Sequence, residues 1–143
     1  MIIGVPKEIK EGEKRVGIIA QGVDALVAHG HRVLIEKKAG IGSGFSDKEY
    51  REAGAALVEH EKDIWVEAEM IVKVKEPLEP EFALMRPGQV LFTYLHLAAD
   101  RELTDRLIEC RIIGIATSDD AYQRDHRRSG TEARRQGRIR RHL

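Results

Sequence analysis

Short apolar runs alternate with amphipathic segments along the first 116 residues of the chain. Apolar and β-branched residues, which favour strands, concentrate in six runs, at 2–5, 32–36, 56–58, 70–75, 90–95 and 111–116. The segments between them have helical spacing; in residues 21–29, for example, Val23, Leu26 and Val27 fall at i, i+3 and i+4. Strands joined by helical crossovers are parallel, and the crossovers are right-handed. The alternation therefore predicts an α/β fold, a doubly wound parallel sheet with helices on both faces.

Further helices are expected at 47–54, 60–69 and 100–110, and about one helical turn at 81–85. Asp47 and Asp100 stand where a side chain caps the first turn of a helix. Gly30 suits the carboxyl end of the first helix, because glycine adopts a left-handed conformation without strain.

The composition is typical of a soluble globular domain, since 42% of the 143 residues are hydrophobic and 34% are charged. No stretch approaches the roughly 18 consecutive apolar residues of a membrane span, and the amino terminus lacks the order of a signal peptide. The single Cys110 cannot form an internal disulfide, and the histidines show no metal-ligand spacing. We expect a cytoplasmic protein with no membrane contact and no metal.

Residues 117–143 differ in composition from the rest of the chain. They hold eight arginines, no lysine and four acidic residues, whereas residues 1–116 hold 20 of the 24 acidic residues. Because few of them are apolar, burial cannot offset the entropy that the chain loses on ordering. We predict one domain at 1–116 and an arginine-rich, disordered tail at 117–143. Nucleic acid is not an expected partner, since the tail has only one aromatic residue, Tyr122, and the domain is acidic.

Two titratable residues follow apolar runs at the expected ligand-binding edge of the sheet. Lys75 precedes Glu76-Pro77 at the end of run 70–75, and His96 follows run 90–95. Open parallel sheets bind ligands outside the carboxyl ends of their strands, so a cation and a proton carrier are expected at one edge. The alternatives are a solvated lysine face that Lys75 shares with Lys73, and a histidine that is merely hydrogen-bonded in the core.

Arg15 lies in a charged, glycine-containing loop after the first strand. Its planar guanidinium can hold a carboxylate through two hydrogen bonds, although an inert surface loop has the same composition. The glycines at 40, 42 and 44 follow a strand and precede a helix, but they lack the third glycine of the dinucleotide fingerprint. We therefore assign no cofactor-binding residue to this chain.

Several segments together resemble the amino-terminal domain of NAD-dependent alanine dehydrogenase: 1–8, 14–16, 30–31, 39–55, 71–77 and 91–98. The resemblance covers about residues 1–116 and implies a Rossmann-like or flavodoxin-like substrate domain. The same domain occurs in the alpha subunit of proton-translocating nicotinamide transhydrogenase. The joint presence of Arg15, Lys75 and His96 favours the dehydrogenase.

The resemblance implies oxidative deamination of L-alanine to pyruvate and ammonium, with NAD as the cofactor and a homo-oligomer as a possible assembly. Arg15 matches the family's clamp for the substrate carboxylate, Lys75 its second substrate-binding cation, and His96 its proton donor and acceptor. Tyr94 is expected to line the same pocket. These roles suit the chemistry of a guanidinium, an ammonium and an imidazole around a small keto acid.

The chain departs from this family after Ala116. Alanine dehydrogenases are more than twice as long and carry a Rossmann domain for NAD, whose fingerprint does not follow here. We expect a truncated or frame-shifted product that is inactive alone. The amino-terminal part of a transhydrogenase alpha subunit and a non-catalytic interaction fragment remain the alternatives.

Overall fold

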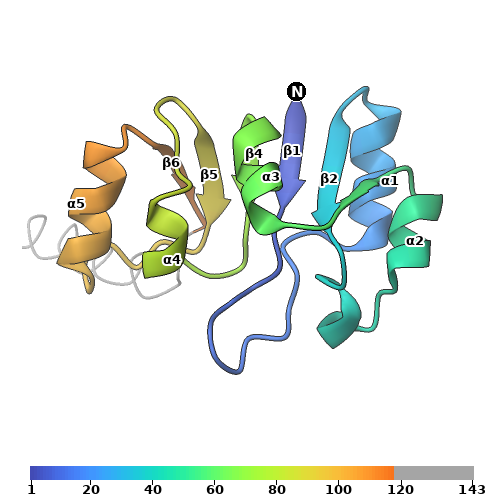
Figure 1. Cartoon of the computed structure of the whole chain (residues 1–143), viewed down its shortest axis with the longest axis horizontal. Coiled ribbons are helices and arrows are strands. Elements are labelled where there is room, and N and C mark those ends of the chain that lie inside the picture. The colour runs from blue at the N-terminus through green and yellow to red at the C-terminus, as the bar shows by residue number, and fades with distance from the viewer. Residues whose placement is uncertain (118–143) are drawn as a thin grey trace, which may run out of the picture.

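The computed structural model describes residues 1–117, which form a six-stranded sheet covered by helices (Figure 1). The strands are β1 (Ile2–Val5), β2 (Arg32–Glu36), β3 (Ala56–Val58), β4 (Met70–Val72), β5 (Val90–Thr93) and β6 (Ile113–Ala116). The helices are α1 (Ala20–Ala28), α2 (Asp47–Glu52), α3 (Glu61–Glu67), α4 (Glu79–Phe82) and α5 (Arg101–Glu109), with a 3₁₀ turn η1 (Ile41–Ser43). The predicted alternation is confirmed. Apart from Thr117, the tail for which we predicted disorder lies outside the described residues.

Every strand pair is parallel, and the strand order is β3-β2-β1-β4-β5-β6. This is the Rossmann order rather than the flavodoxin order, and it confirms the predicted doubly wound class. β1 and β4 are neighbours, but the strands that follow them lie on opposite sides of this pair: β2 is beside β1, and β5 is beside β4. The loops that follow these two strands, residues 6–19 and 73–78, therefore border the crevice where such folds bind ligands.

The sheet buries an apolar layer on each face. On one face, Val23 of α1 and Tyr50 of α2 pack against the inward side chains of β1 and β2. On the other, Trp65 of α3 and Leu103 of α5 pack against Leu91 of β5 and its neighbours. Figure 1 shows α1 and α2 beside β2, with α4 and α5 at the opposite end of the sheet. None of the helices in the described part of the chain is long and apolar enough to cross a membrane.

The helix caps follow the predictions in one case and not in the other. Asp100 caps α5, since its Oδ1 accepts a hydrogen bond from the Leu103 N–H at 2.9 Å. Asp47 was the wrong choice for α2, because the cap is Ser46, in a capping box with Glu49. The carboxylate of Asp47 instead accepts from the Lys38 N–H at 2.7 Å, which ties the helix to the turn after β2.

Strands β4 and β5 are shorter than predicted, and both end before the residues of interest. β4 stops at Val72 rather than at residue 75, and β5 stops at Thr93 rather than at residue 95. The Lys73 N–H still donates to the Phe92 carbonyl, but the next N–H, that of Val74, donates to the Glu8 carboxylate at 2.6 Å. A side chain thus binds the Val74 N–H, while the Val74 carbonyl still accepts a hydrogen bond from the Tyr94 N–H at 3.4 Å.

Candidate functional site

Arg15 is held in the loop after β1 by a carboxylate two residues away. Its Nε and Nη2 donate to the two oxygens of Glu13 at 2.9 and 2.7 Å, and its backbone N–H donates to the first of them at 2.8 Å. The pKa of Glu13 is lowered to about 2, mainly by the hydrogen bond from the Arg15 side chain and to a smaller extent by the charge of Lys75. Within residues 1–117, nothing bonds the remaining nitrogen, Nη1. The end of the guanidinium therefore keeps a pair of donors for another anion.

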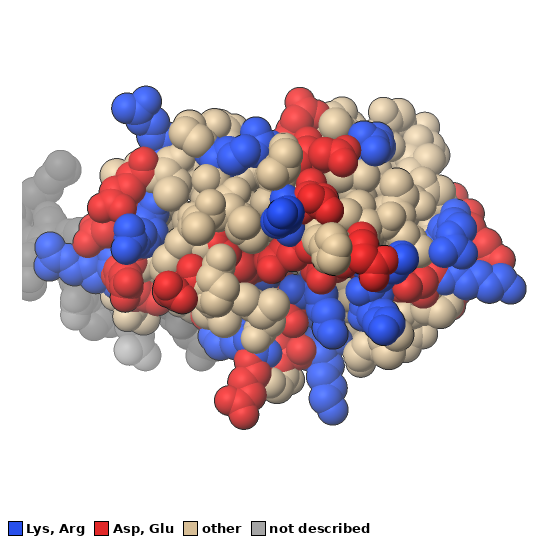
Figure 2. Space-filling view, in the orientation of Figure 1, with Lys and Arg blue, Asp and Glu red and all other residues tan. Residues whose placement is uncertain are grey.

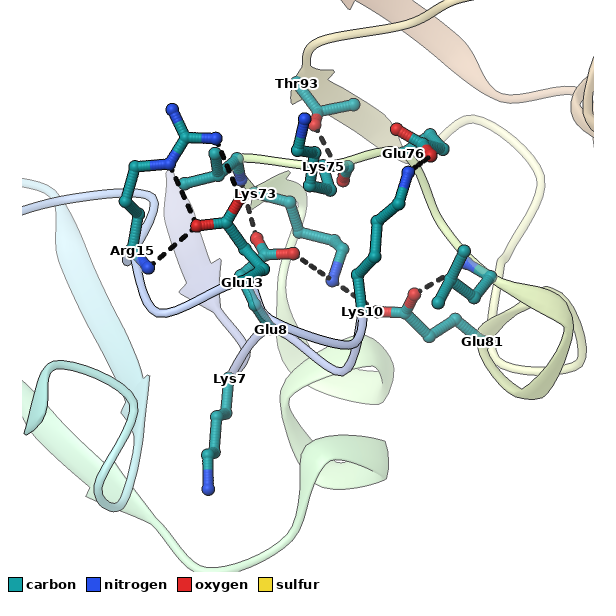
Figure 3. A network of polar contacts seen from close by, with 12 residues as sticks. Lys7, Glu8, Lys10, Glu13, Arg15, Lys73, Lys75, Glu76, Glu81 and Thr93 are labelled. Atoms are coloured by element: carbon teal, nitrogen blue, oxygen red, sulfur yellow. Dashed lines mark hydrogen bonds and ion pairs between the residues drawn. The ribbon is translucent and has the colours of Figure 1, made fainter. Parts of the chain in front are cut away.

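Lys75 and Tyr94 lie beside this arginine. The Lys75 carbonyl accepts a hydrogen bond from the Thr93 hydroxyl at 2.9 Å, so the end of β5 holds the backbone that carries the lysine. In Figure 3 the side chains of Arg15 and Lys75 lie to either side of the Glu13 carboxylate, and the charge of Lys75 acts on that carboxylate. Glu13 is the main cause of the raised pKa of Arg15, with smaller contributions from Tyr94 and Glu8. The cations Arg15 and Lys75 and the phenol of Tyr94 thus lie close together at the carboxyl end of the sheet.

His96 lies in the exposed turn after β5, near Glu76. Burial raises the pKa of Glu76, but the hydrogen bond from Lys10 and the charges of Lys10 and His96 outweigh it, so the net pKa lies below its usual value. Lys10 belongs to the loop after β1, while Glu76 belongs to the loop after β4. This pair ties the two loops together across the switch point (Figure 3).

Beneath the exposed residues lies a cluster that is closed to solvent: Lys73, Glu8 and Glu81, here called the buried charge cluster. Their side chains are 1%, 2% and 0% exposed. The Lys73 ammonium lies 3.3 Å from Glu8 Oε2 and 2.6 Å from Glu81 Oε1. Burial raises the pKa of Glu81 to about 7, although the charge of Lys73 lowers it.

A cavity of about 510 Å³ opens on the other side of Arg15. It lies between the loop after β1 and the turn after β2, and its lining includes Lys7, Lys14, Lys38, Glu8 and Glu13. The residues lining it do not include Lys75, Tyr94 or His96. Arg15 therefore stands between this cavity and the other predicted site residues.

The structure places all four predicted site residues on the loops at the carboxyl end of the sheet, but not at the positions expected. Lys75 and His96 each lie three residues beyond their strand. The suggestion that Lys73 shares a solvated face with Lys75 is wrong, because Lys73 points inward to two carboxylates. Sequence reasoning missed Glu8, Glu13 and Glu81. The partner of Glu8 lies 66 residues away, which local spacing cannot reveal. Glu13, by contrast, is two residues from Arg15, and this closeness was a signal that could have found it.

The described residues do not fit a dinucleotide. A Rossmann domain that binds NAD has a tight glycine turn after β1, where pyrophosphate meets a helix amino terminus. Here β1 is followed by a long loop, residues 6–19, before α1 begins at Ala20, so no glycine turn brings a helix amino terminus directly after the strand. In the same part of the chain, no group of His, Cys, Asp and Glu side chains is arranged to hold a metal ion.

Comparisons with known proteins agree with this geometry. Residues 4–130 match the family model described as the alanine dehydrogenase/PNT N-terminal domain. Alanine dehydrogenase of Staphylococcus haemolyticus is 53% identical over 116 residues, which are 81% of this chain and 31% of that protein. The chain thus spans about a third of the length of such relatives.

Solved structures give the same result. One titled L-alanine dehydrogenase superposes with a TM-score of 0.79 at 56% identity, over 81% of this chain and 32% of that one. A transhydrogenase from Sinorhizobium meliloti superposes with a TM-score of 0.76 at 28% identity, over 81% of this chain and 33% of that one. The transhydrogenase is the lesser match, in agreement with the preference drawn from Arg15, Lys75 and His96. The chain belongs to the alanine dehydrogenase/PNT N-terminal domain family, on the alanine dehydrogenase side.

Proposed function

We propose that this chain supplies the substrate-binding half of an NAD-dependent alanine dehydrogenase, which interconverts L-alanine with pyruvate and ammonium. The observation that carries the proposal is the grouping of Arg15 and Lys75 around Glu13, of Tyr94 with Arg15 and of His96 beside Glu76, at the switch point of the sheet. Relatives more than half identical over 116 residues bear the name alanine dehydrogenase.

Arg15 binds the carboxylate that pyruvate and L-alanine share. Glu13 takes the Nε and Nη2 side of the guanidinium and fixes its orientation, so the end with Nη1 receives the substrate. An arginine with a single anchored rotamer loses less entropy on binding than a free one. Glu13 therefore prepares Arg15 for a small acid.

Lys75 supplies the positive charge for the other end of the substrate. Its ammonium interacts with the carbonyl oxygen of pyruvate, or with the oxygen of the carbinolamine, and draws negative charge toward it. Tyr94 closes the pocket beside Arg15. His96 donates and accepts protons as water or ammonia adds to the imine or ketone carbon, because imidazole changes charge near neutral pH.

NAD supplies the hydride acceptor in this proposal. Because the described residues do not fit a dinucleotide, no step performed by this chain's residues passes through the cofactor. We also propose a cytoplasmic location, since the single Cys110 gives the chain no internal disulfide.

The proposal is tested by titrating pyruvate into the ¹⁵N-labelled chain and following amide shifts by NMR. We expect saturable shifts in the loops 6–19 and 73–78, and a loss of affinity of about tenfold or more in Arg15→Gln, because a charge-assisted pair is removed. Arg32→Gln is the matched control: Arg32 is 57% exposed, Arg15 is 61% exposed, and each pairs with one glutamate. Equal weakening in both variants, or no saturable shift in these loops, would contradict the proposal.

A further inference from the structure

The buried charge cluster lies directly under the segment that carries Lys75. Lys73 begins this segment and α4, with Glu81, follows it, while Glu8 reaches it from the loop after β1. Three charges from three parts of the chain thus meet out of contact with water. Such an arrangement needs a physical reason, because desolvating a charge costs several kcal/mol.

Both carboxylates of the cluster have the same bonding pattern. One oxygen of each faces the Lys73 ammonium, and the other accepts a backbone N–H of segment 73–78 (Figure 3). Glu8 Oε1 accepts from Val74 at 2.6 Å, and Glu81 Oε2 accepts from Leu78 at 2.8 Å. The two bonds hold the segment on either side of Lys75.

A third bond fixes the lysine itself, since its carbonyl accepts from the Thr93 hydroxyl at 2.9 Å. The segment therefore continues past Val72 without becoming a free loop, because side-chain oxygens bond its backbone at 74, 75 and 78 and the Val74 carbonyl accepts from the Tyr94 N–H. Apolar side chains of similar volume would fill the same space at equal or better stability, but they could not bind these backbone groups. The bonding pattern thus points to position rather than stability.

We propose that Lys73, Glu8 and Glu81 are positioning residues that hold the backbone of segment 73–78 so that the Lys75 ammonium faces the carboxylate-binding end of Arg15. This inference rests on the proposed function for what Lys75 binds, but not for how its segment is held. Lys73 directs the two carboxyl groups, and the carboxyl groups hold the backbone.

Two charge-free triple variants separate these roles. In Glu8→Gln/Lys73→Met/Glu81→Gln, each amide oxygen still accepts its backbone N–H; in Glu8→Leu/Lys73→Met/Glu81→Leu, neither backbone N–H has an acceptor. We expect the first to bind pyruvate within about twofold of the unmodified chain, and the second to bind it about tenfold more weakly. Equal pyruvate affinity in the two triple variants would overturn the inference.

A measurement without pyruvate keeps this test separate from the proposed function. Hydrogen exchange at the Val74 and Leu78 amides should accelerate at least about tenfold in the leucine variant and stay nearly unchanged in the glutamine variant. If the unmodified chain does not bind pyruvate but exchange behaves in this way, the proposed function fails and the positioning role stands. Unchanged exchange in the leucine variant would overturn the positioning role itself.

Thr93→Val provides the second test if a triple variant does not fold. It removes only the bond to the Lys75 carbonyl and preserves the shape of the side chain. We expect pyruvate affinity to fall about three- to tenfold, the range for one neutral hydrogen bond, with the Val74 amide still protected. An affinity equal to that of the unmodified chain would overturn the inference.

Discussion

Two clusters lie at the carboxyl end of the sheet, and each contains both cations and carboxylates. They differ in burial, and the pKa values of their carboxyl groups shift in opposite directions. In the first, Arg15 projects into solvent and pairs with Glu13 of its own loop. In the second, the buried charge cluster, Lys73 and two carboxylates are closed to water. The pKa of Glu13 falls to about 2, because the Arg15 hydrogen bond outweighs desolvation. The pKa of Glu81 rises to about 7, because desolvation outweighs the charge of Lys73.

The comparison shows which cation remains available to a ligand. Arg15 is 61% exposed, although the side chain of Glu13 is only 8% exposed, so a substrate carboxylate can add to Arg15 from the solvent at little cost. The buried ammonium of Lys73 already pairs with the carboxyl groups of Glu8 and Glu81 and is closed to a ligand. Removing one partner would leave an uncompensated charge in the interior. On the face of the molecule that Figure 2 shows, Lys and Arg are interspersed with Asp and Glu, so that face has no large area of a single sign. Selectivity for a small acid is therefore expected to come from individual groups such as Arg15 and Lys75.

The largest effect is expected from Lys73→Met alone. It leaves Glu8 and Glu81 buried without a counter-ion and should lower the free energy of unfolding by about 3–5 kcal/mol. Urea denaturation at pH 8 measures the change, with Lys37→Met as the control, because Lys37 forms an exposed pair with Glu59 that is worth about 1 kcal/mol or less. Similar losses in the two variants would show that burial does not distinguish the two regions.

The fold could be predicted from local patterns, because each strand is apolar enough to be recognised from its own residues without knowledge of its neighbours. The runs at 2–5, 32–36 and 56–58 coincide with β1, β2 and β3, and the crossovers fix their parallel direction. Arg15, Lys75 and His96 could be placed at the rim by the same reasoning, since they follow strands that end at one edge.

The buried charge cluster could not be predicted, because its members are joined only in space. Lys73 alternates with Lys75, so the period of two assigns both to one exposed face. That period applies only while the strand continues, and β4 ends at Val72 because Glu8 takes the Val74 N–H. A partner 66 residues away leaves no trace in local spacing.

The second effect is a dependence of stability on pH that Glu81 causes. Lys73 from the end of β4, the Leu78 N–H from the start of α4 and Glu61 of α3 all face this carboxyl group. Its pKa is about 7 in the folded chain and 4.5 ordinarily, so the folded form binds the proton more tightly. The resulting stabilisation is complete below pH 4.5 and is lost as the pH rises through 7, with a total of about 3 kcal/mol.

Urea denaturation at pH 5 and at pH 8 tests this dependence. The glutamine in Glu81→Gln cannot titrate. The change in the free energy of unfolding between the two pH values should therefore be smaller in this variant than in the unmodified chain, and the difference between the two changes should be about 2–3 kcal/mol. Glu52→Gln is a suitable control, since Glu52 pairs with Lys48 on the surface. Equal pH dependence in Glu81→Gln and the unmodified chain would mean that the carboxyl is ionised throughout.

The smallest effect is expected at the pair of Arg15 and Glu13, because Arg15 is 61% exposed and solvent screens its charge. The carboxyl of Glu13 should titrate below pH 4.5 by NMR, and in Arg15→Gln its midpoint should return toward 4.5. The stabilisation from this pair is present above pH 4.5 and is lost as the pH falls below it, the opposite direction to that of Glu81. Because Arg15 is exposed, Arg15→Gln should lower the free energy of unfolding at pH 7 by less than about 1 kcal/mol. A loss as large as that of Lys73→Met would mean that Arg15 is held as a structural ion and is not free for a substrate, and the contrast between the two regions would disappear.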